Sequence, residues 1–295
     1  MKIIKNIWNY ILSCIWYITP NNKYKNIKFI EDEDTINAIV KEKKSICRFG
    51  DGEFRIMENI PSNFFQKNDV ELSKRLQEVM KSNKENILIG LPIAFRNLKD
   101  YTAKTRVFWK IHIYKYRKQW MKYIDLKKYY CNSSITRCYI DYKDKSTANK
   151  RFENIKEIWK DKKVCIVEGS NTKIGVGNDL LNNAQEVKRI IAPQKSAFDK
   201  YNEILIEINK MSKDYLILIA LGPTATVLAY DLANIGYQAI DIGHIDIEYE
   251  WFLSKAKKKT AIQGKYVNEA KDNNYNINIK DEEYEKSIIA KILNE

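Results

Sequence analysis

Residues 215–242 read YLILIALGPTATVLAYDLANIGYQAIDI, and this stretch decides the fold class. Its first part, Tyr215 to Leu221, is the most apolar strand candidate in the chain. A helix is predicted from Pro223 to Asn234, because proline in the first helical turn loses no hydrogen bond. A second strand is predicted from Gln238 to Ile242. A strand, a helix of crossover length and another strand indicate a parallel sheet covered by helices.

The same alternation continues upstream of this unit. Further strands are predicted at residues 45–49, 86–91, 163–167 and 187–192. Further helices are predicted at residues 34–42, 70–81, 101–125, 146–160, 177–185 and 197–211. The sequence therefore predicts an α/β, Rossmann-like fold, with a mostly parallel sheet and helices on both faces. No linker marks a boundary near residue 145, so we expect one composite domain over residues 21–295, with a polar, peripheral tail after Lys255.

Charge and cysteine content limit the classes of function. The 295 residues include 51 Lys and Arg against 38 Asp and Glu, a net charge of +13. A basic surface favours nucleic acid, anionic lipid or phosphorylated substrates, although scattered lysines also describe an ordinary solvated surface. The recognisable nucleic-acid modules leave no signature, so we expect no nucleic-acid partner. The five cysteines form no CxxC pair, which argues against zinc and disulfides and favours a cytoplasmic location.

Residues 1–20 predict an amphipathic N-terminal helix. Ile4, Trp8, Ile11 and Ile15 recur on one helical face. The stretch is too short and too polar for a spanning helix, and no cleavage site of a signal peptide follows it. A basic helix with two tryptophans suits an anionic membrane surface, here the inner face of the cell membrane. Packing on the domain is an equal alternative.

Four unusual segments follow predicted strands. They are residues 48–53 (RFGDGE), 168–179 (EGSNTKIGVGND), 222–226 (GPTAT) and 241–251 (DIGHIDIEYEW). In an open parallel sheet, ligands bind beyond the carboxyl ends of the strands. Because parallel strands end at the same edge, we expect the four segments to meet around one ligand.

The first segment pairs two carboxylates. Asp51 and Glu53 lie two positions apart and are interleaved with Gly50 and Gly52. A hard divalent cation binds one or two carboxylates together with water and diphosphate oxygens. Glycine also lets the backbone approach a ligand closely. From spacing alone an ordinary acidic turn is the simpler explanation, since Asp and Gly both favour turns.

The second and third segments are candidates for phosphate binding. A glycine-bearing loop between a strand and a helix offers backbone N–H groups and a helix N-terminus to phosphate. The spacing in 168–179 matches neither the dinucleotide fingerprint nor the P-loop. Small residues in 222–226 suit a close-fitting diphosphate or ribose, although Pro and Thr are also ordinary at a helix start.

The fourth segment holds a cluster of acid–base groups. If the segment is extended, His244, Asp246, Glu248 and Glu250 lie on one side, where they could bind a metal or act as a general base. The other histidine, His112, is interpreted as structural or surface.

Together, RFGDGE, EGSNTKIGVGNDLL, LGPTATVLAYDLA and DIGHIDIEYEW resemble the bacterial glycosyltransferases of the GT-D fold type, a family once known as a domain of unknown function. The resemblance covers about residues 29–251, and it implies a nucleotide-binding core there, a UDP-sugar donor and hexosyltransferase-type activity. It also implies a D-x-E motif for a divalent cation, usually Mn²⁺ with Mg²⁺ as the alternative, which matches Asp51 and Glu53. Carried over to this sequence, the nucleotide site comprises Arg48, Gly50, Glu168, Gly169, Asn171, Gly175, Gly177, Asp179, Gly222, Pro223 and Thr224.

The resemblance implies metal-dependent transfer of a sugar to a hydroxyl of a growing bacterial glycan. Capsule, lipopolysaccharide and glycoprotein glycans, including lipid-linked forms, are the acceptor classes we expect. If the reaction inverts the anomeric centre, a carboxylate of Asp246, Glu248 or Glu250, or else His244, is expected to deprotonate the acceptor. Two alternatives stay open: a non-catalytic basic adaptor for nucleic acid or anionic membrane, and another sugar-nucleotide enzyme on the same fold.

Overall fold

The computed structural model describes residues 23–61, 65–270 and 281–294. The predicted helix at residues 1–20 lies outside these ranges. Within them, no helix combines the length and the hydrophobicity that a membrane-spanning segment needs.

The described strands form one parallel sheet. Their order across the sheet is β1-β4-β3-β2-β8-β7-β5-β6-β9. All the pairings are parallel, so consecutive strands of the chain are joined by crossover connections. The strands are β1 (Lys28–Phe29), β2 (Ser45–Arg48), β3 (Ile87–Leu91), β4 (Tyr129–Asn132), β5 (Lys163–Gly169), β6 (Glu186–Ala192), β7 (Leu216–Ala220), β8 (Gln238–Asp241) and β9 (Ile288–Lys291).

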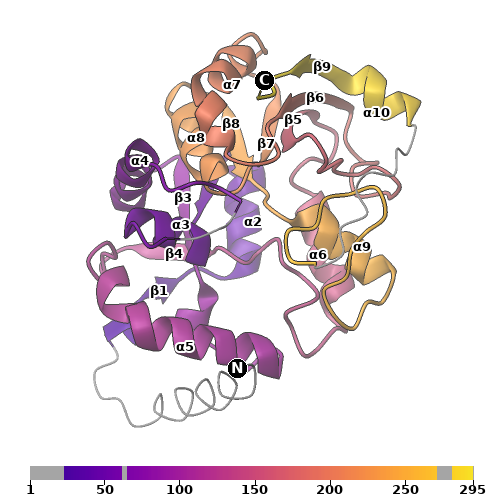
Figure 1. The fold of residues 1–295 in the computed structure, drawn as a ribbon. Helices are drawn as coiled ribbons and strands as arrows, with labels where there is room; N and C mark the ends of the chain where they lie inside the picture. The colour runs from indigo at the N-terminus through magenta and orange to yellow at the C-terminus, as the bar shows by residue number, and fades with distance from the viewer. Residues whose placement is uncertain (1–22, 62–64, 271–280, 295) are drawn as a thin grey trace.

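Helices cover both faces of this sheet (Figure 1). One face carries α3 (Asp51–Met57), α4 (Val70–Lys81), α5 (Ala103–Trp120), α7 (Tyr201–Ile208) and α8 (Pro223–Asn234). The other face carries α2 (Asp32–Lys41), α6 (Ala148–Lys156) and α9 (Ile245–Leu253). The short elements are the 3₁₀ helices η1 (Lys23–Asn26), η2 (Ile93–Phe95) and η3 (Ala197–Lys200), and the helix α10 (Glu282–Ser287) at the β9 edge.

The central strands are apolar on both sides because both sides are covered. In β5, Cys165 and Val167 pack under the α4, α7 and α8 layer, whereas Val164 and Ile166 pack under the α2, α6 and α9 layer. All four side chains are fully buried. Successive side chains of a strand point to opposite faces, which explains this division into two cores.

The predicted α/β architecture is confirmed. The helices α4 and α8 begin and end at the predicted residues, and each predicted strand is present with bounds shifted by no more than two residues. The two short strands β1 and β4 were not predicted from the sequence. His112 is buried and accepts a hydrogen bond from Trp120 Nε1 at 2.9 Å, in agreement with a structural role.

Two local predictions are wrong. Residues 177–185 form turns instead of a helix, because Gly175 and Gly177 adopt φ values of +77° and +78°. Residues 245–253 form the helix α9, so the segment from 241 to 251 is not extended. Asp246 and Glu250 therefore share one helical face, and Glu248 points elsewhere.

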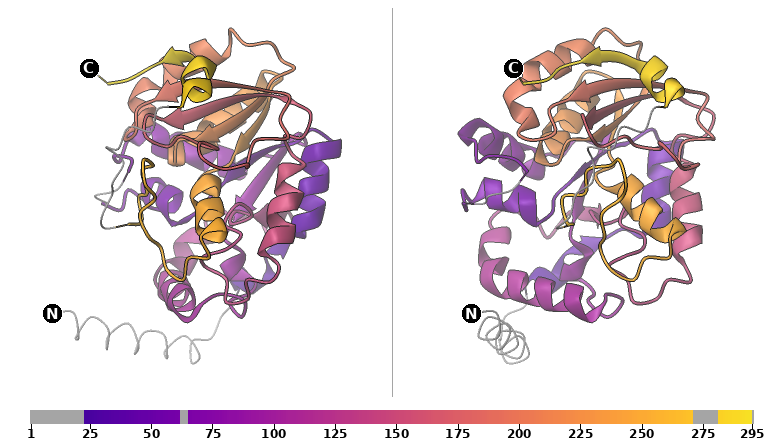
Figure 2. Two further views of the ribbon diagram at one scale, coloured as in Figure 1. Left: turned by 90° about the vertical axis from the view of Figure 1, so that its right-hand side faces the viewer. Right: turned by 45° about the vertical axis from the view of Figure 1, so that its right-hand side comes forward.

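The segment after Lys255 was expected to be peripheral, but part of it is buried. Lys265 and Val267 are buried within the domain, at 2% and 0% exposure. The last strand, β9, pairs with β6 and lies at the end of the molecule opposite α5 (Figure 2). The described cysteines, Cys47, Cys131, Cys138 and Cys165, are buried free thiols.

Candidate active site

The strands β2 and β8 are neighbours in the middle of the sheet, and a buried ion pair joins their carboxyl ends. Arg48 Nη2 lies 2.7 Å from Asp241 Oδ1, with side-chain exposures of 12% and 6%. Arg48 Nη1 donates to Ser133 O at 2.9 Å and to Thr136 Oγ1 at 2.7 Å. The predicted phosphate partner Arg48 is therefore held by protein groups, and it fixes the edge on which the four segments converge.

Asp51 and Glu53 occupy the first turn of α3, directly beyond β2. Glu53 Oε2 accepts a hydrogen bond from Gly50 N at 2.7 Å, which is the one half of a capping box that a glycine N-cap allows. Both side chains are partly buried. Burial raises the pKa of Glu53 to about 7, and the negative charges of Asp241 and Asp51 add to the effect. The turn thus concentrates negative charge that a bound cation would stabilise.

A ring of alternating charges lies beside Asp51. Glu269 bridges the two cations, with Oε1 3.2 Å from Arg137 Nη1 and Oε2 3.2 Å from Lys259 Nζ. Asp141 bridges them on the other side, with Oδ1 3.3 Å from Lys259 Nζ and Oδ2 3.8 Å from Arg137 Nη1. Burial raises the pKa of Asp51, and the positive charge of Arg137 opposes that rise. Burial alone would raise the pKa of Glu269, but the positive charges of Arg137 and Lys259 outweigh burial and lower it. The two cations of the ring therefore lie where an anionic donor group could meet them.

Sequence reasoning missed this ring. Arg137 follows β4, a strand too short to be predicted from periodicity, so its position at the carboxyl edge was not evident. Lys259 and Glu269 belong to the segment that was expected to be a peripheral tail. Prediction of β4 would have placed Arg137 at the correct edge, but nothing in the local pattern marks Lys259 or Glu269.

His244 is the member of the predicted acid–base cluster that faces the charged ring. It precedes α9 as the N-cap residue and is partly buried. Burial, together with the positive charge of Arg137, lowers the pKa of His244 to about 4. The imidazole is consequently neutral near pH 7 and has a lone pair to accept a proton.

The three carboxylates that follow His244 serve the fold. Asp246 accepts from Gly175 N at 2.8 Å and lies 2.7 Å from Lys265 Nζ. Glu250 lies 2.8 Å from Lys265 Nζ and accepts from Asn178 Nδ2 at 2.7 Å. These two side chains hold the 168–179 loop and the 262–265 segment to α9. The interpretation of Asp246 as an acceptor base is corrected, because only 2% of its side chain is exposed.

Glu248 is also corrected as a candidate base. Its side chain is fully buried, and Oε2 accepts from Tyr139 N at 3.1 Å and Ile140 N at 2.9 Å. Burial raises the pKa of Glu248 to about 7, against the opposing charge of Arg137. Because it has no surface toward solvent, the carboxyl shapes the turn after β4 instead of contacting a substrate.

The 168–179 loop is shaped by side chains at its own ends. Glu168 is fully buried, receives Arg189 Nη1 at 2.6 Å and accepts from Ile174 N at 2.7 Å. The interpretation of Glu168 as a nucleotide contact is therefore wrong, since it has no exposed surface. Asp179 is 54% exposed and pairs with Lys156 at 3.0 Å. Gly177 is exposed, so the middle of the loop remains accessible.

The turn after β7 lies under an aromatic ring. Gly222 has φ +56°, and an added Cβ would come within 2.9 Å of the Phe65 ring. Thr224 is fully buried and donates through Oγ1 to Gln66 Oε1 at 3.2 Å, while Pro223 is buried beside it. Thr224 and Pro223 thus hold the turn, and direct nucleotide contact at this turn is left to the partly exposed Gly222.

A glutamine side chain occupies the equivalent place after β5. An added Cβ at Gly169 would lie 3.0 Å from Gln194 Oε1, which accepts from Asn171 N at 2.7 Å. Asn171 O accepts from Tyr266 N at 2.8 Å. The loops after β5, β6 and α9 are therefore joined at this edge, as expected for segments that surround one ligand.

The donor atoms near Asp51 fit one kind of metal ion. Among residues 23–61, 65–270 and 281–294, no three His, Cys, Asp or Glu side chains gather in an arrangement that could hold a metal. A closed protein cage is therefore not formed there. Asp51 and Glu53 are the candidate ligands, and a hard divalent ion that takes one or two carboxylates would complete its shell with water and phosphate oxygens.

The chain matches a known protein family and solved structures of the same fold. A family model described as "Glycosyltransferase GT-D fold" matches residues 46–270. A solved structure described as "The highly conserved domain of unknown function 1792 has a distinct glycosyltransferase fold" superposes with a TM-score of 0.85 at 38% identity, covering 92% of this chain and 98% of that one. "A New Glycosyltransferase (DUF1792) from Streptococcus sanguinis" gives a TM-score of 0.83 at 34% identity, covering 90% and 99%.

Two curated relatives are longer proteins. "Glycosyltransferase GlyD" of Streptococcus pneumoniae serotype 4 is 38% identical over 268 residues, which are 89% of this chain and 32% of the relative. "Probable glycosyl transferase Gly" of Streptococcus gordonii is 36% identical over 277 residues, which are 92% of this chain and 40% of the relative. The chain thus spans less than half of either relative. The family match, the fold and these identities show that the chain belongs to the glycosyltransferases of the GT-D fold.

Proposed function

We propose that this protein transfers a sugar from a UDP-sugar to a hydroxyl of a growing bacterial glycan, with the help of a divalent cation. One observation carries the proposal: the charge of Arg137 acts on the pKa of both Asp51, at the start of α3, and His244, so the D-x-E turn and the neutral imidazole lie on either side of the same charged ring. Negative, positive and proton-accepting groups thus meet at the carboxyl edge of a Rossmann-like sheet, where nucleotide ligands bind.

Asp51 and Glu53 would hold the cation, Mn²⁺ or Mg²⁺, which supplies positive charge against the phosphates of the donor. The accessible backbone at Gly175, Gly177 and Gly222 would contact the nucleotide. Among the charged groups, Arg137 has the largest effect on the pKa of Asp51, so its guanidinium would stabilise negative charge on the departing diphosphate.

His244 would accept the proton of the acceptor hydroxyl if the transfer inverts the anomeric centre. Three points support this choice over the neighbouring carboxylates. The imidazole is neutral, it is partly exposed, and it faces the same ring as Asp51, whereas Asp246 and Glu248 are consumed by buried contacts. Glu250 is tied to Lys265 and Asn178.

The metal assignment is tested with isosteric variants. Asp51→Asn and Glu53→Gln should each lower metal-dependent release of UDP from UDP-sugars by about 100-fold or more, because preorganised charge at a reacting centre is worth several kcal/mol. Glutamine can still accept the hydrogen bond from Gly50, so the fold should persist. A panel of UDP-sugars with Mn²⁺ or Mg²⁺, and GDP-sugars for comparison, gives the measurement.

Asp69→Asn serves as the matched control, because Asp69 also stands at a helix start and caps α4 through Leu72 N at 2.8 Å. It should retain full turnover. Wild-type turnover in both Asp51→Asn and Glu53→Gln would refute the metal assignment.

We also propose peripheral contact of residues 1–20 with the anionic inner face of the cell membrane, where lipid-linked acceptors are exposed. The sequence pattern of Trp and Ile on one face and Lys on the other supports this. Flotation with vesicles containing an anionic phospholipid should recover the full chain and not a chain that starts at residue 21. Equal recovery of both chains would count against the contact.

A further inference from the structure

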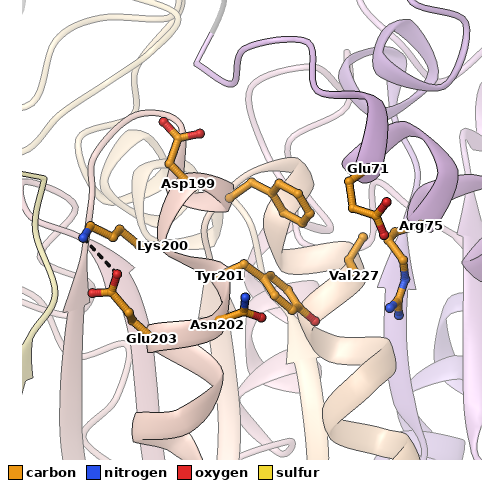
Figure 3. A pocket seen from close by; sticks show the side chains of 9 residues that line it. Glu71, Arg75, Asp199, Lys200, Tyr201, Asn202, Glu203 and Val227 are labelled. Carbon is orange, nitrogen blue, oxygen red and sulfur yellow. Dashed lines mark hydrogen bonds and ion pairs between the residues drawn. The ribbon is translucent and has the colours of Figure 1, made fainter.

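A cavity of about 370 Å³ opens between three helices and is lined by none of the candidate site residues discussed above (Figure 3). Its walls come from α4, from η3 with α7, and from α8. The volume falls in the range that small-molecule sites occupy. The lining residues are Glu71, Arg75, Phe198, Asp199, Lys200, Tyr201, Asn202, Glu203 and Val227.

The charges in this cavity disfavour a phosphate. Arg75 lies 2.5 Å from Asp231 and 3.1 Å from Glu78, and Lys200 lies 2.9 Å from Glu203. Both lining cations are therefore already paired with carboxylates. Glu71 adds a further negative charge to the walls, and Asp199 adds a carboxylate that is paired with Lys67 at 3.5 Å. The lining carboxylates outnumber the lining cations, so a nucleotide or another polyanion is disfavoured here and an uncharged ligand fits better than an anionic one.

The same walls offer what a sugar ring binds. The rings of Phe198 and Tyr201 lie with centroids 5.2 Å apart at an interplanar angle of 44°. The Tyr201 hydroxyl donates to Asp231, which also holds Arg75, so its ring is fixed in place. Apolar C–H faces pack on such rings, while Glu71 and Asn202, on opposite walls in Figure 3, can bond to hydroxyl groups.

The cavity is connected to the candidate active site through one side chain. Gln66 Oε1 accepts from Thr224 Oγ1 at 3.2 Å and from Phe198 N at 3.4 Å. Thr224 belongs to the turn at Gly222, and Phe198 belongs to the cavity wall. Ser196 N also donates to Phe65 O at 2.9 Å, and the Phe65 ring covers Gly222. The cavity wall and the nucleotide turn therefore share one support.

We propose that this cavity is a subsite for a neutral sugar residue, and that the sugar belongs to the acceptor glycan. The assignment to the acceptor rests on the proposed transferase function. The binding of a neutral sugar does not depend on it. The carboxylate and amide walls around two fixed aromatic rings define a carbohydrate ligand, and the Gln66 link places it next to the donor.

Saturation-transfer NMR tests the binding directly. The probes are the methyl glycosides of glucose, galactose and N-acetylglucosamine, with glucuronic acid as the anionic counterpart. Wild-type protein should bind at least one neutral glycoside and discriminate against glucuronic acid. Phe198→Ala and Asn202→Ala should each weaken that binding, roughly tenfold for the aromatic change. Asn202 is exposed, so its variant should fold even if Phe198→Ala does not.

Phe108→Ala is the matched control, since Phe108 is an aromatic side chain on α5 with 45% exposure and lies outside the cavity. It should bind like wild type. Metal-dependent UDP release should be unchanged in Asn202→Ala, while the KM for the acceptor should rise. If the wild-type protein releases no UDP, the proposed transferase function is refuted and the subsite is not. Absence of any neutral glycoside binding, or equal binding by all variants, would overturn the subsite.

Discussion

At the scale of single residues, Gly243 sets the position of the central ion pair. It follows β8 with φ +48°, and an added Cβ would lie 2.1 Å from Arg48 Nη2. To relieve this contact the guanidinium would have to move, and Nη2 is the atom that pairs with Asp241. A glycine at position 243 therefore leaves room for the Arg48 guanidinium. Arg48 in turn holds β2, β8 and the turn after β4 together.

Gly243→Ala should consequently cost far more stability than an ordinary glycine substitution. Gly236→Ala is the matched control, because Gly236 also has a positive φ, +91°, but nothing lies within 4 Å of the added Cβ. The control should cost about 1–2 kcal/mol of unfolding free energy from backbone strain alone. Gly243→Ala should lose about 3–5 kcal/mol more, as for disruption of a buried ion pair. Urea unfolding measures both, and equal losses would contradict the steric argument.

Glu248 should make stability depend on pH. Its pKa in the folded protein, about 7, lies above the ordinary value of 4.5. Between these values the folded state binds more protons than the unfolded chain, so the contribution of Glu248 to stability falls as pH rises from about 4.5 to 7. The fall should reach a few kcal/mol at most.

Glu248→Gln removes this titration and retains an oxygen for Tyr139 N and Ile140 N. Between pH 5 and 8 the variant should therefore lose less unfolding free energy than wild type. Glu157→Gln, at a side chain 52% exposed, is the control and should follow the wild-type curve. Parallel curves for Glu248→Gln and wild type would show that the buried carboxyl does not titrate in this range.

The residues also show where sequence reasoning succeeds. Asp51 and Glu53 could be singled out because their motif is local, and His244 because histidine is rare in this chain. Arg137, Lys259 and Glu269 could not, since lysine and arginine are common here and nothing nearby marks these three. Only the fold brings them to Asp51, across separations of more than eighty residues.

At the scale of elements, periodicity predicted the strands and long helices well, because burial on a sheet or helix face repeats with a fixed period. It failed where distant side chains fix the backbone. The turn at residues 174–178 is held by Glu168 and by Asp246 from α9. The alternation in IDIEYEW resembles a strand, yet these residues form a helix in which Ile245, Ile247, Tyr249 and Trp251 are all buried.

Lys265 joins these elements, and its loss should be costly. Its Nζ lies 2.7 Å from Asp246 and 2.8 Å from Glu250, and its side chain is 2% exposed. Lys265→Met should lose about 3–5 kcal/mol of unfolding free energy, because two carboxylates remain without their cation. Lys265→Met with Asp246→Asn should recover part of the loss.

The control is Lys210→Met, at a side chain 65% exposed that pairs with Glu207. It should change stability by less than about 1 kcal/mol. Chemical unfolding measures the unfolding free energy of Lys265→Met, of Lys265→Met with Asp246→Asn, and of Lys210→Met. If Lys265→Met proves as stable as Lys210→Met, the 262–265 segment is not held to α9 by this pair.

At the scale of the whole molecule, the candidate site lies where two groups of strands meet. The strands β2, β3 and β4 lie on one side of the join, and β8, β7, β5 and β6 lie on the other. The sequence could predict every strand of these groups except the short β4, but not the order of the strands, since strand order depends on which crossovers pack together. The join at β2 and β8 brings the D-x-E turn to His244, and the switch between β7 and β5 brings Gly222 to the 168–179 loop.

The outer edge of the second group depends on the C-terminal segment. The strand β9 pairs with β6 at Arg189, Ile190 and Ile191, and Tyr284 of α10 packs with Val176 and Ile191. A chain that ends at residue 280 should still fold, because β6 keeps seven paired positions with β5. It should, however, self-associate, because β6 becomes an uncovered edge strand.

Light scattering coupled to gel filtration over a range of concentrations measures this association, with circular dichroism to verify folding. Ile191→Lys in the shortened chain is the informative partner variant. A lysine on an edge strand opposes pairing with another chain, so this variant should return toward a monomer. A shortened chain that stays monomeric at every concentration would mean that β9 does not protect the sheet, and would leave the C-terminal segment the role of covering Arg189 with Tyr284 of α10.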